Sequence, residues 1–71
     1  MVRKEIVEKL KKDYCKGDRV QLMKMDDVQA PPVGTLGTVQ YVDDIGTIHV
    51  AWDNGSGLGV CYGVDRCIQI K

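Results

Sequence analysis

The sequence predicts a small, mainly β protein in which five short antiparallel strands follow one amphipathic helix. The first observation is that residues 34–55 have the pattern strand, tight turn, strand, tight turn. The second is that apolar residues recur with helical spacing only near the N-terminus. The third is the length of 71 residues, which is that of one domain with a small core.

Two central strands are predicted from runs of β-forming residues at 38–42 and 47–52. Side chains alternate between the two faces of a strand, so each run presents every second residue to the same side. In the first run, Val39 and Tyr41 are expected to share one face of the strand. In the second run, Ile48, Val50 and Trp52 are expected to share one face, opposite Thr47, His49 and Ala51.

Two tight turns bound the second of these strands. Residues 43–46 read Asp-Asp-Ile-Gly, in which Asp favours the start of a turn and Gly accepts a positive φ. Residues 53–56 contain Asn54-Gly55, which predicts a type I′ hairpin with positive φ at both central residues. The two hairpins together make a three-stranded meander.

Residues 2–13 are predicted to form a helix with one apolar stripe. Glu5 precedes Lys9 by four residues, the favourable order for an i,i+4 pair. We expect this helix to dock on the sheet and cover an opening or an edge. A basic helix for nucleic acid or membrane is the alternative, but interleaved acidic residues dilute its positive face. The expected stripe consists of Val2, Ile6, Val7, Leu10 and Tyr14.

Three more strands are expected besides the two central ones, and the strand after residue 56 completes the meander. Residues 24–34 should form a loop, because Pro31 and Pro32 remove two ladder donors. Residues 62–65 should form a turn, read as one turn of 3₁₀ helix. The additional strands are predicted at residues 19–23, 58–62 and 67–70.

The net charge of zero hides an asymmetry along the chain. Residues 1–24 hold eight Lys or Arg and four Asp or Glu, a balance of +4. Residues 25–65 hold six Asp and no Lys or Arg, a balance of −6, and Arg66 and Lys71 restore neutrality. Because phosphate contacts need Lys and Arg, this central segment disfavours nucleic acid.

The composition also bounds the class of protein. An apolar content of 44% is too high for a disordered chain. No apolar run is long enough to span a bilayer, and the N-terminus lacks a signal-peptide pattern. We therefore expect a cytoplasmic protein with no membrane partner.

Several short motifs cover nearly the whole chain. They are Lys16-Gly17-Asp18-Arg19-Val20, Met25-Asp26-Asp27, Ala30-Pro31-Pro32, Gly34-Thr35-Leu36-Gly37-Thr38-Val39, Val42-Asp43-Asp44-Ile45-Gly46, Val50-Ala51-Trp52-Asp53-Asn54-Gly55 and Gly63-Val64-Asp65. Together these motifs resemble the bacterial family known as domain of unknown function 4314, and the resemblance implies no established activity. The chain departs from the family at Cys15, Cys61 and Cys67, where Pro, an aliphatic and an aromatic residue are expected.

The order of strands and loops also looks like an SH3-like small barrel. What this resemblance implies is a mainly β fold, an SH3-like five-stranded antiparallel barrel with an N-terminal α-helix. Residues 1–14 would form the helix docked on the barrel, and residues 16–71 the barrel itself, as a single domain.

No catalytic, cofactor or metal site is predicted. Cys15, Cys61 and Cys67 lack the paired spacing of a zinc ribbon, and His49 is expected opposite the apolar face. Cys61 and His49 could meet across strands, but nothing in the spacing supplies a nucleophile, base and orienter in contact. We therefore expect a protein that is not an enzyme, takes no cofactor and folds without metal or disulfide.

Three functions remain open: a protein- or peptide-interaction module, a nucleic-acid-binding accessory domain that uses the helix and first strand, and a structural domain of an assembly. The charge distribution favours the first. The partner would be an unknown protein or a basic peptide, and the chain a monomer or weak homodimer.

The predicted binding surface is a groove flanked by residues 24–34, 43–46 and 62–65, as in an SH3-like loop order. An acidic rim attracts Arg or Lys, and aromatic faces stack on guanidinium or proline. The alternative is that the Asp residues only shape turns and keep the protein soluble. The predicted partner-binding residues are Asp26, Asp27, Asp43, Asp44, Tyr62, Tyr41 and Trp52.

Overall fold

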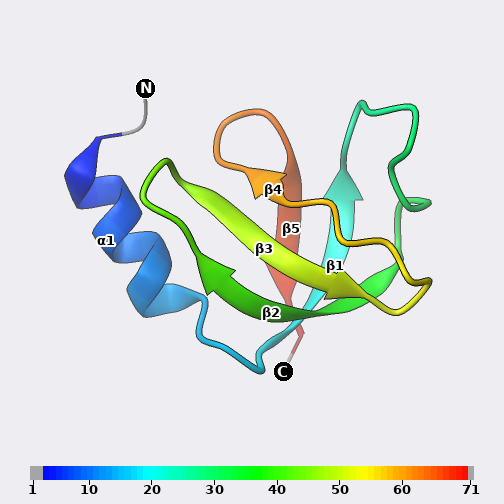
Figure 1. The fold of residues 1–71 in the computed structure, drawn as a ribbon, viewed down its shortest axis with the longest axis horizontal. Coiled ribbons are helices and arrows are strands. Elements are labelled where there is room, and N and C mark those ends of the chain that lie inside the picture. Colours follow the sequence, from blue (N-terminus) through cyan, green and yellow to red (C-terminus); the bar gives the residue numbers. More distant parts are fainter. Residues whose placement is uncertain (1–2, 71) are drawn as a thin grey trace.

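The computed structural model describes residues 3–70 and contains one helix and five strands. The strands form one antiparallel sheet in the order β4-β3-β2-β1-β5 (Figure 1). This confirms the predicted mainly β architecture with an N-terminal helix. Within these residues β4 and β5 are both edges, so the sheet is not closed, and a barrel is not confirmed. The elements are α1 (Lys4–Asp13), β1 (Arg19–Lys24), β2 (Leu36–Val42), β3 (Thr47–Trp52), β4 (Val60–Cys61) and β5 (Arg66–Gln69).

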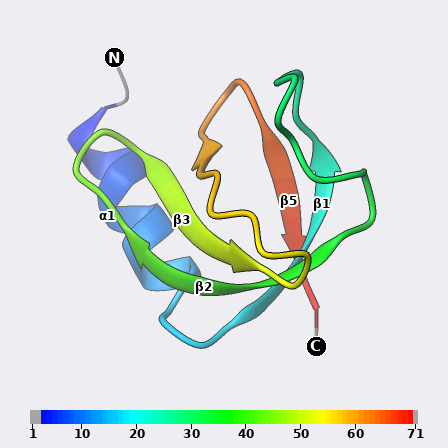
Figure 2. The same cartoon turned by 45° about the vertical axis from the view of Figure 1, so that its right-hand side comes forward.

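The core lies inside the bent sheet and is apolar. Its fully buried side chains are Val20, Leu22, Val39 and Val50, from the three central strands. Figures 1 and 2 show that β2 is strongly curved, so that its two ends lie on different sides of the molecule. The alternation of buried and exposed residues along β1 and β3 is the expected one for strands with a single core-facing side.

A β-bulge at Gln40 changes which residues of β2 face the core. Val39 pairs with Val50, while Tyr41 pairs with His49, so β2 carries one extra residue. The predicted shared face of Val39 and Tyr41 was wrong for this reason: Val39 is buried and Tyr41 is exposed. The bulge interrupts the alternation of inward and outward side chains that the sequence predicts for this strand.

The hairpin turn after β3 is a three-residue loop that ends in a glycine bulge. Gly55 has a φ of 94° and donates its N–H to Trp52 O at 2.9 Å. The Trp52 N–H in turn donates to Ser56 O at 2.9 Å. No non-glycine residue in 3–70 has a positive φ, so Asn54 does not adopt the type I′ conformation, and that prediction was wrong.

The fourth strand is shorter than predicted. Ser56 is opposite Trp52, and Val60 is opposite Ile48. The residues between them, 57–59, run alongside β3 but do not form regular strand hydrogen bonds with it. The Leu58 carbonyl instead accepts a hydrogen bond from Nε1 of Trp52 at 2.8 Å. A side chain thus replaces a backbone donor at this point of the strand.

Residues 62–65 form a hydrogen-bonded turn without a 3₁₀ helix. The N–H groups of Val64 and Asp65 both donate to Cys61 O, at 3.1 and 2.9 Å. The Tyr62 N–H donates to Gly46 O at 3.1 Å, which joins this turn to the turn between β2 and β3.

Helix α1 lies beside the hairpin of β2 and β3 (Figures 1 and 2). Val7 and Leu10 are buried, and Ile6 and Tyr14 pack partly against the core, as the apolar stripe predicts. Val2, the first residue of the predicted stripe, lies outside the described residues. No helix within residues 3–70 is long and apolar enough to cross a membrane.

Candidate binding pocket between the helix and the open sheet edge

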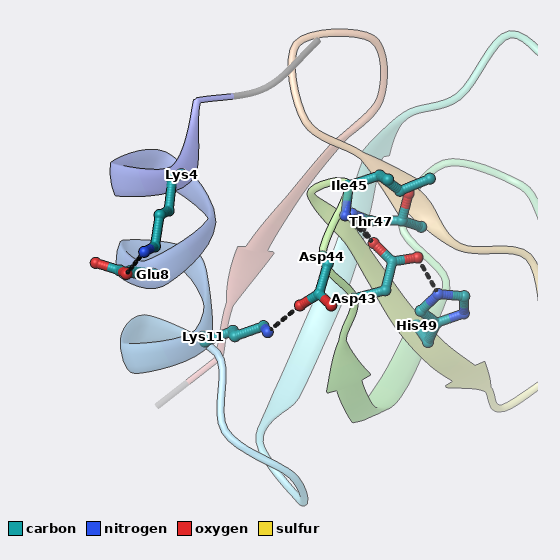
Figure 3. Close-up of polar contacts among 8 residues, drawn as sticks. All are labelled: Lys4, Glu8, Lys11, Asp43, Asp44, Ile45, Thr47 and His49. Atoms are coloured by element: carbon teal, nitrogen blue, oxygen red, sulfur yellow. Dashed lines mark hydrogen bonds and ion pairs between the residues drawn. The ribbon is translucent and has the colours of Figure 1, made fainter.

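The two acidic residues of the 43–46 turn both contact other residues of the domain (Figure 3). Oδ1 of Asp43 accepts the N–H groups of Ile45 and Thr47 at 3.1 and 2.9 Å, and Oδ2 lies 2.8 Å from Nε2 of His49. Asp44 Oδ1 lies 2.5 Å from Nζ of Lys11, so this carboxylate joins the turn to α1. Both acids therefore shape or fasten the turn.

The environment of Asp43 favours its ionised form. The hydrogen bond from His49 is the largest cause, and the N–H groups of Thr47 and Ile45 add to it. Together they lower the pKa of Asp43 below its usual range, against the opposing effect of partial burial.

The other two predicted acids, Asp26 and Asp27, lie in the loop between β1 and β2 and are exposed. Oδ1 of Asp27 accepts the Gln29 N–H at 2.8 Å, and its carbonyl accepts the Ala30 N–H, so this residue also shapes a turn. None of the four predicted acids lines the pocket described below.

The three predicted aromatic residues have separate environments. Trp52 is 3% exposed and belongs to the core. Tyr41 is exposed and stacks on His49, with ring centroids 4.3 Å apart and planes 10° from parallel. Tyr62 is half-exposed and lines a pocket. Of the seven predicted binding residues, Tyr62 alone belongs to that pocket.

The pocket has a volume of about 730 Å³ and lies between α1, β4, β5 and the turn that joins these two strands. We call it the seam pocket, because it occupies the side where the sheet stays open. Most of its wall is apolar, which is the usual character of a binding site in a protein. Its lining residues are Leu10, Tyr14, Lys24, Ile48, Val60, Tyr62, Gly63, Val64, Asp65, Arg66, Cys67, Ile68 and Gln69.

The free edge of β5 borders the seam pocket. The Ile70 N–H donates to Arg19 O at 2.9 Å, so the backbone groups of Ile70 point toward β1. Because backbone direction alternates along a strand, those of Ile68 also point toward β1. By the same alternation, Cys67 and Gln69 turn theirs away from β1. Within residues 3–70 these outward groups have no backbone partner, so β5 offers a place for another strand.

Two cations stand at the same pocket. Lys24 and Arg66 are cross-strand partners of β1 and β5, and both are exposed. Neither forms an ion pair within residues 3–70. In the sequence, Lys24 and Arg66 are the residues on either side of segment 25–65, which contains no Lys or Arg.

The three thiols have different environments. Cys67 lines the seam pocket, and burial raises the pKa of its thiol to about 11, so it stays protonated at neutral pH. Cys61 Sγ contacts Thr47 Oγ1 at 3.7 Å, and Cys15 is exposed beside the end of α1. Among residues 3–70 no three His, Cys, Asp or Glu side chains gather as metal ligands.

Comparison with protein families matches residues 3–70 to the family described as a domain of unknown function (DUF4314). The chain belongs to this family. Searches of curated proteins and of solved structures found no match. DUF4314 membership covers both the helix and the sheet, so the seam pocket is built wholly from residues of the family domain.

Proposed function

We propose that this domain is a non-catalytic interaction module, and that an extended segment of a partner protein binds in the seam pocket. The observation that carries the proposal is the free edge of β5 beside an apolar hollow. A bound strand would pair with the outward backbone groups of Cys67 and Gln69, and its alternate side chains would enter the pocket.

The exposed apolar side chains at the pocket support this proposal. Tyr62, Val64 and Ile68 are 49, 66 and 39% exposed, although they line the same pocket as several core residues. A bound segment would remove their apolar surface from water, at about 25 cal/mol for each Å². The short free edge limits the number of backbone hydrogen bonds, so the expected affinity is weak.

The alternative of nucleic-acid binding draws little support from the cations of α1 and β1. Lys4, Lys9 and Lys11 of α1 lie within ion-pair distance of Glu8, Asp13 and Asp44. Arg19 makes a two-pronged contact with Asp53, with N–O distances of 2.9 and 2.6 Å. These pairs neutralise the charges that would otherwise contact phosphates.

The strand order supports a further proposal about fold. β5 returns to pair with β1, and the remaining strands form a meander, which is the arrangement expected for an SH3-like fold. We propose that the domain is an open member of this class, with α1 beside the unclosed seam.

The experiment is an NMR titration of the isotope-labelled domain with a library of short extended peptides. Binding should shift the amide signals of β5 and the 62–65 turn. Val64→Asp should abolish these shifts, because it places a charge in the apolar wall. Val28→Asp is the matched control, since Val28 is a fully exposed loop valine outside the pocket. Shifts confined to other surfaces, or unchanged by Val64→Asp, would contradict the proposal.

A further inference from the structure

The seam pocket has two like charges placed opposite each other. Lys24 of β1 and Arg66 of β5 are Cα partners, and both residues line the pocket. Like charges directly opposite in a sheet repel each other and destabilise the pair. Within residues 3–70 no carboxylate lies within ion-pair distance of either side chain.

The one acid in the pocket wall does not relieve this repulsion. Asp65 directs Oδ2 to the Cys61 N–H at 3.0 Å, so this carboxylate is used to close the turn. The pocket lining therefore contains two positively charged side chains and one negatively charged side chain. The domain is neutral overall, so this positive site is a local feature.

We infer that the segment bound in the seam pocket is an acidic strand, whose apolar side chains enter the pocket and whose carboxylates contact Lys24 and Arg66. This inference rests on the proposed function and specifies its ligand. An Asp or Glu side chain suits the site because Arg offers a planar fork that matches a carboxylate. The apolar wall, with Tyr62, Val64 and Ile68, selects against a bare phosphate or a nucleic-acid backbone, which has no apolar groups to place there.

The repulsion between the two cations gives the inference a second readout. Neutralising either one should leave stability unchanged or raise it slightly, because a like-charge pair is removed. The same change should weaken binding of an acidic strand. If Lys24 or Arg66 served only to stabilise the fold, neutralising it should instead lower stability and leave peptide binding unchanged.

The test uses three blocked peptides in which Val alternates with Glu, with Gln or with Lys, titrated into the labelled chain at low and at physiological salt. The acidic peptide should bind most tightly, and salt should weaken it, since screening acts over about 8 Å at 0.15 M ionic strength. Lys24→Gln and Arg66→Gln should each weaken it about two- to five-fold, as for exposed ion pairs. Lys12→Gln is the matched control, because it removes the same charge from the exposed helix surface.

The outcomes separate this inference from the proposed function. If the Glu and Gln peptides bind the pocket equally, the pocket binds peptides but the acidic preference is refuted. If no peptide shifts the β5 signals, both proposals are refuted. If an oligonucleotide displaces the acidic peptide from Lys24 and Arg66, or if the domain self-associates through this face, the acidic strand is the wrong occupant.

Discussion

Asp43 Oδ2 and His49 Nε2 lie 2.8 Å apart, across the turn that joins β2 to β3. The same carboxylate accepts two backbone N–H groups of the turn (Figure 3). The imidazole of His49 also stacks on the ring of Tyr41. One acid therefore organises the backbone of the turn and the exposed side chains beside it. Its position explains how an Asp here stabilises the turn.

The first prediction concerns Asp43 and acid stability. Its pKa is lowered in the folded state, so its contribution to stability is present above the ordinary value of about 3.9 and is lost as pH falls through the lowered value. Asp43→Ala should cost about 1–2 kcal/mol at neutral pH, because several partly exposed hydrogen bonds are lost. Its stability should also fall less steeply in acid than that of the parent chain.

Thermal unfolding between neutral pH and pH 2.5 measures both effects. Asp26→Asn, in the exposed loop, is the control and should leave the midpoint unchanged at neutral pH. An Asp43→Ala variant as stable as the parent at neutral pH would show that the turn holds without its acid.

A second prediction concerns Gly37 in β2. A Cβ at this position would lie 2.5 Å from Cγ1 of Val50 and 2.7 Å from Cε3 of Trp52, so the indole packs against bare backbone. Gly37→Ala should destabilise the domain by about 1–3 kcal/mol through overpacking. Gly57→Ala is the matched control, since nothing lies within 4 Å of a Cβ there. Denaturant unfolding of the two variants should separate them, and equal stabilities would contradict this packing.

The attachment of α1 provides a third prediction. Leu10 is buried in the core cluster, whereas the Lys11–Asp44 ion pair lies at the surface. Leu10→Ala should cost about 2–5 kcal/mol, while Lys11→Gln should cost no more than about 1 kcal/mol. Apolar packing, and not the ion pair, would then hold the helix. The reverse order in urea unfolding would assign the attachment to electrostatics.

The thiols provide a fourth prediction. At neutral pH a water-soluble thiol reagent should modify Cys15 and Cys61 rapidly, because both are exposed. Cys67 should react slowly until the chain unfolds, since burial protects it and raises the pKa of its thiol to about 11. Mass spectrometry of the modified peptides gives the rates, and rapid labelling of Cys67 in the native domain would show that the seam pocket admits the reagent.

The strands were predictable where local chemistry decides them. Alternating apolar residues and turn-forming Asp and Gly identified the positions of β1, β2 and β3 along the chain. The bulge at Gln40 and the loss of ladder around Leu58 depend on contacts with β3 and with the Trp52 indole, which no local pattern contains. The exposure of Tyr41 followed from the bulge, so it could not be predicted either.

The candidate site was less predictable for a related reason. Asp43 and Asp44 could be recognised as turn residues, but their partners His49 and Lys11 were not evident from spacing alone. The seam pocket joins α1 to β5, elements separated by most of the chain. Of its lining, Tyr62 and the 62–65 turn were placed at the predicted groove from the sequence, whereas Lys24 and Arg66 stood out only as the cations that bound the acidic segment.

Hydrogen exchange at β5 shows whether a partner strand pairs with this edge of the sheet. In the free domain the amide of Ile70, bonded to Arg19 O, should exchange more slowly than those of Cys67 and Gln69, which face away from β1. Saturation with the acidic Val-Glu peptide should slow exchange at Cys67 and Gln69, because a bound strand would accept their hydrogen bonds. If the peptide binds and these two amides exchange as fast as before, no strand is added at β5, and the account of the seam pocket is contradicted.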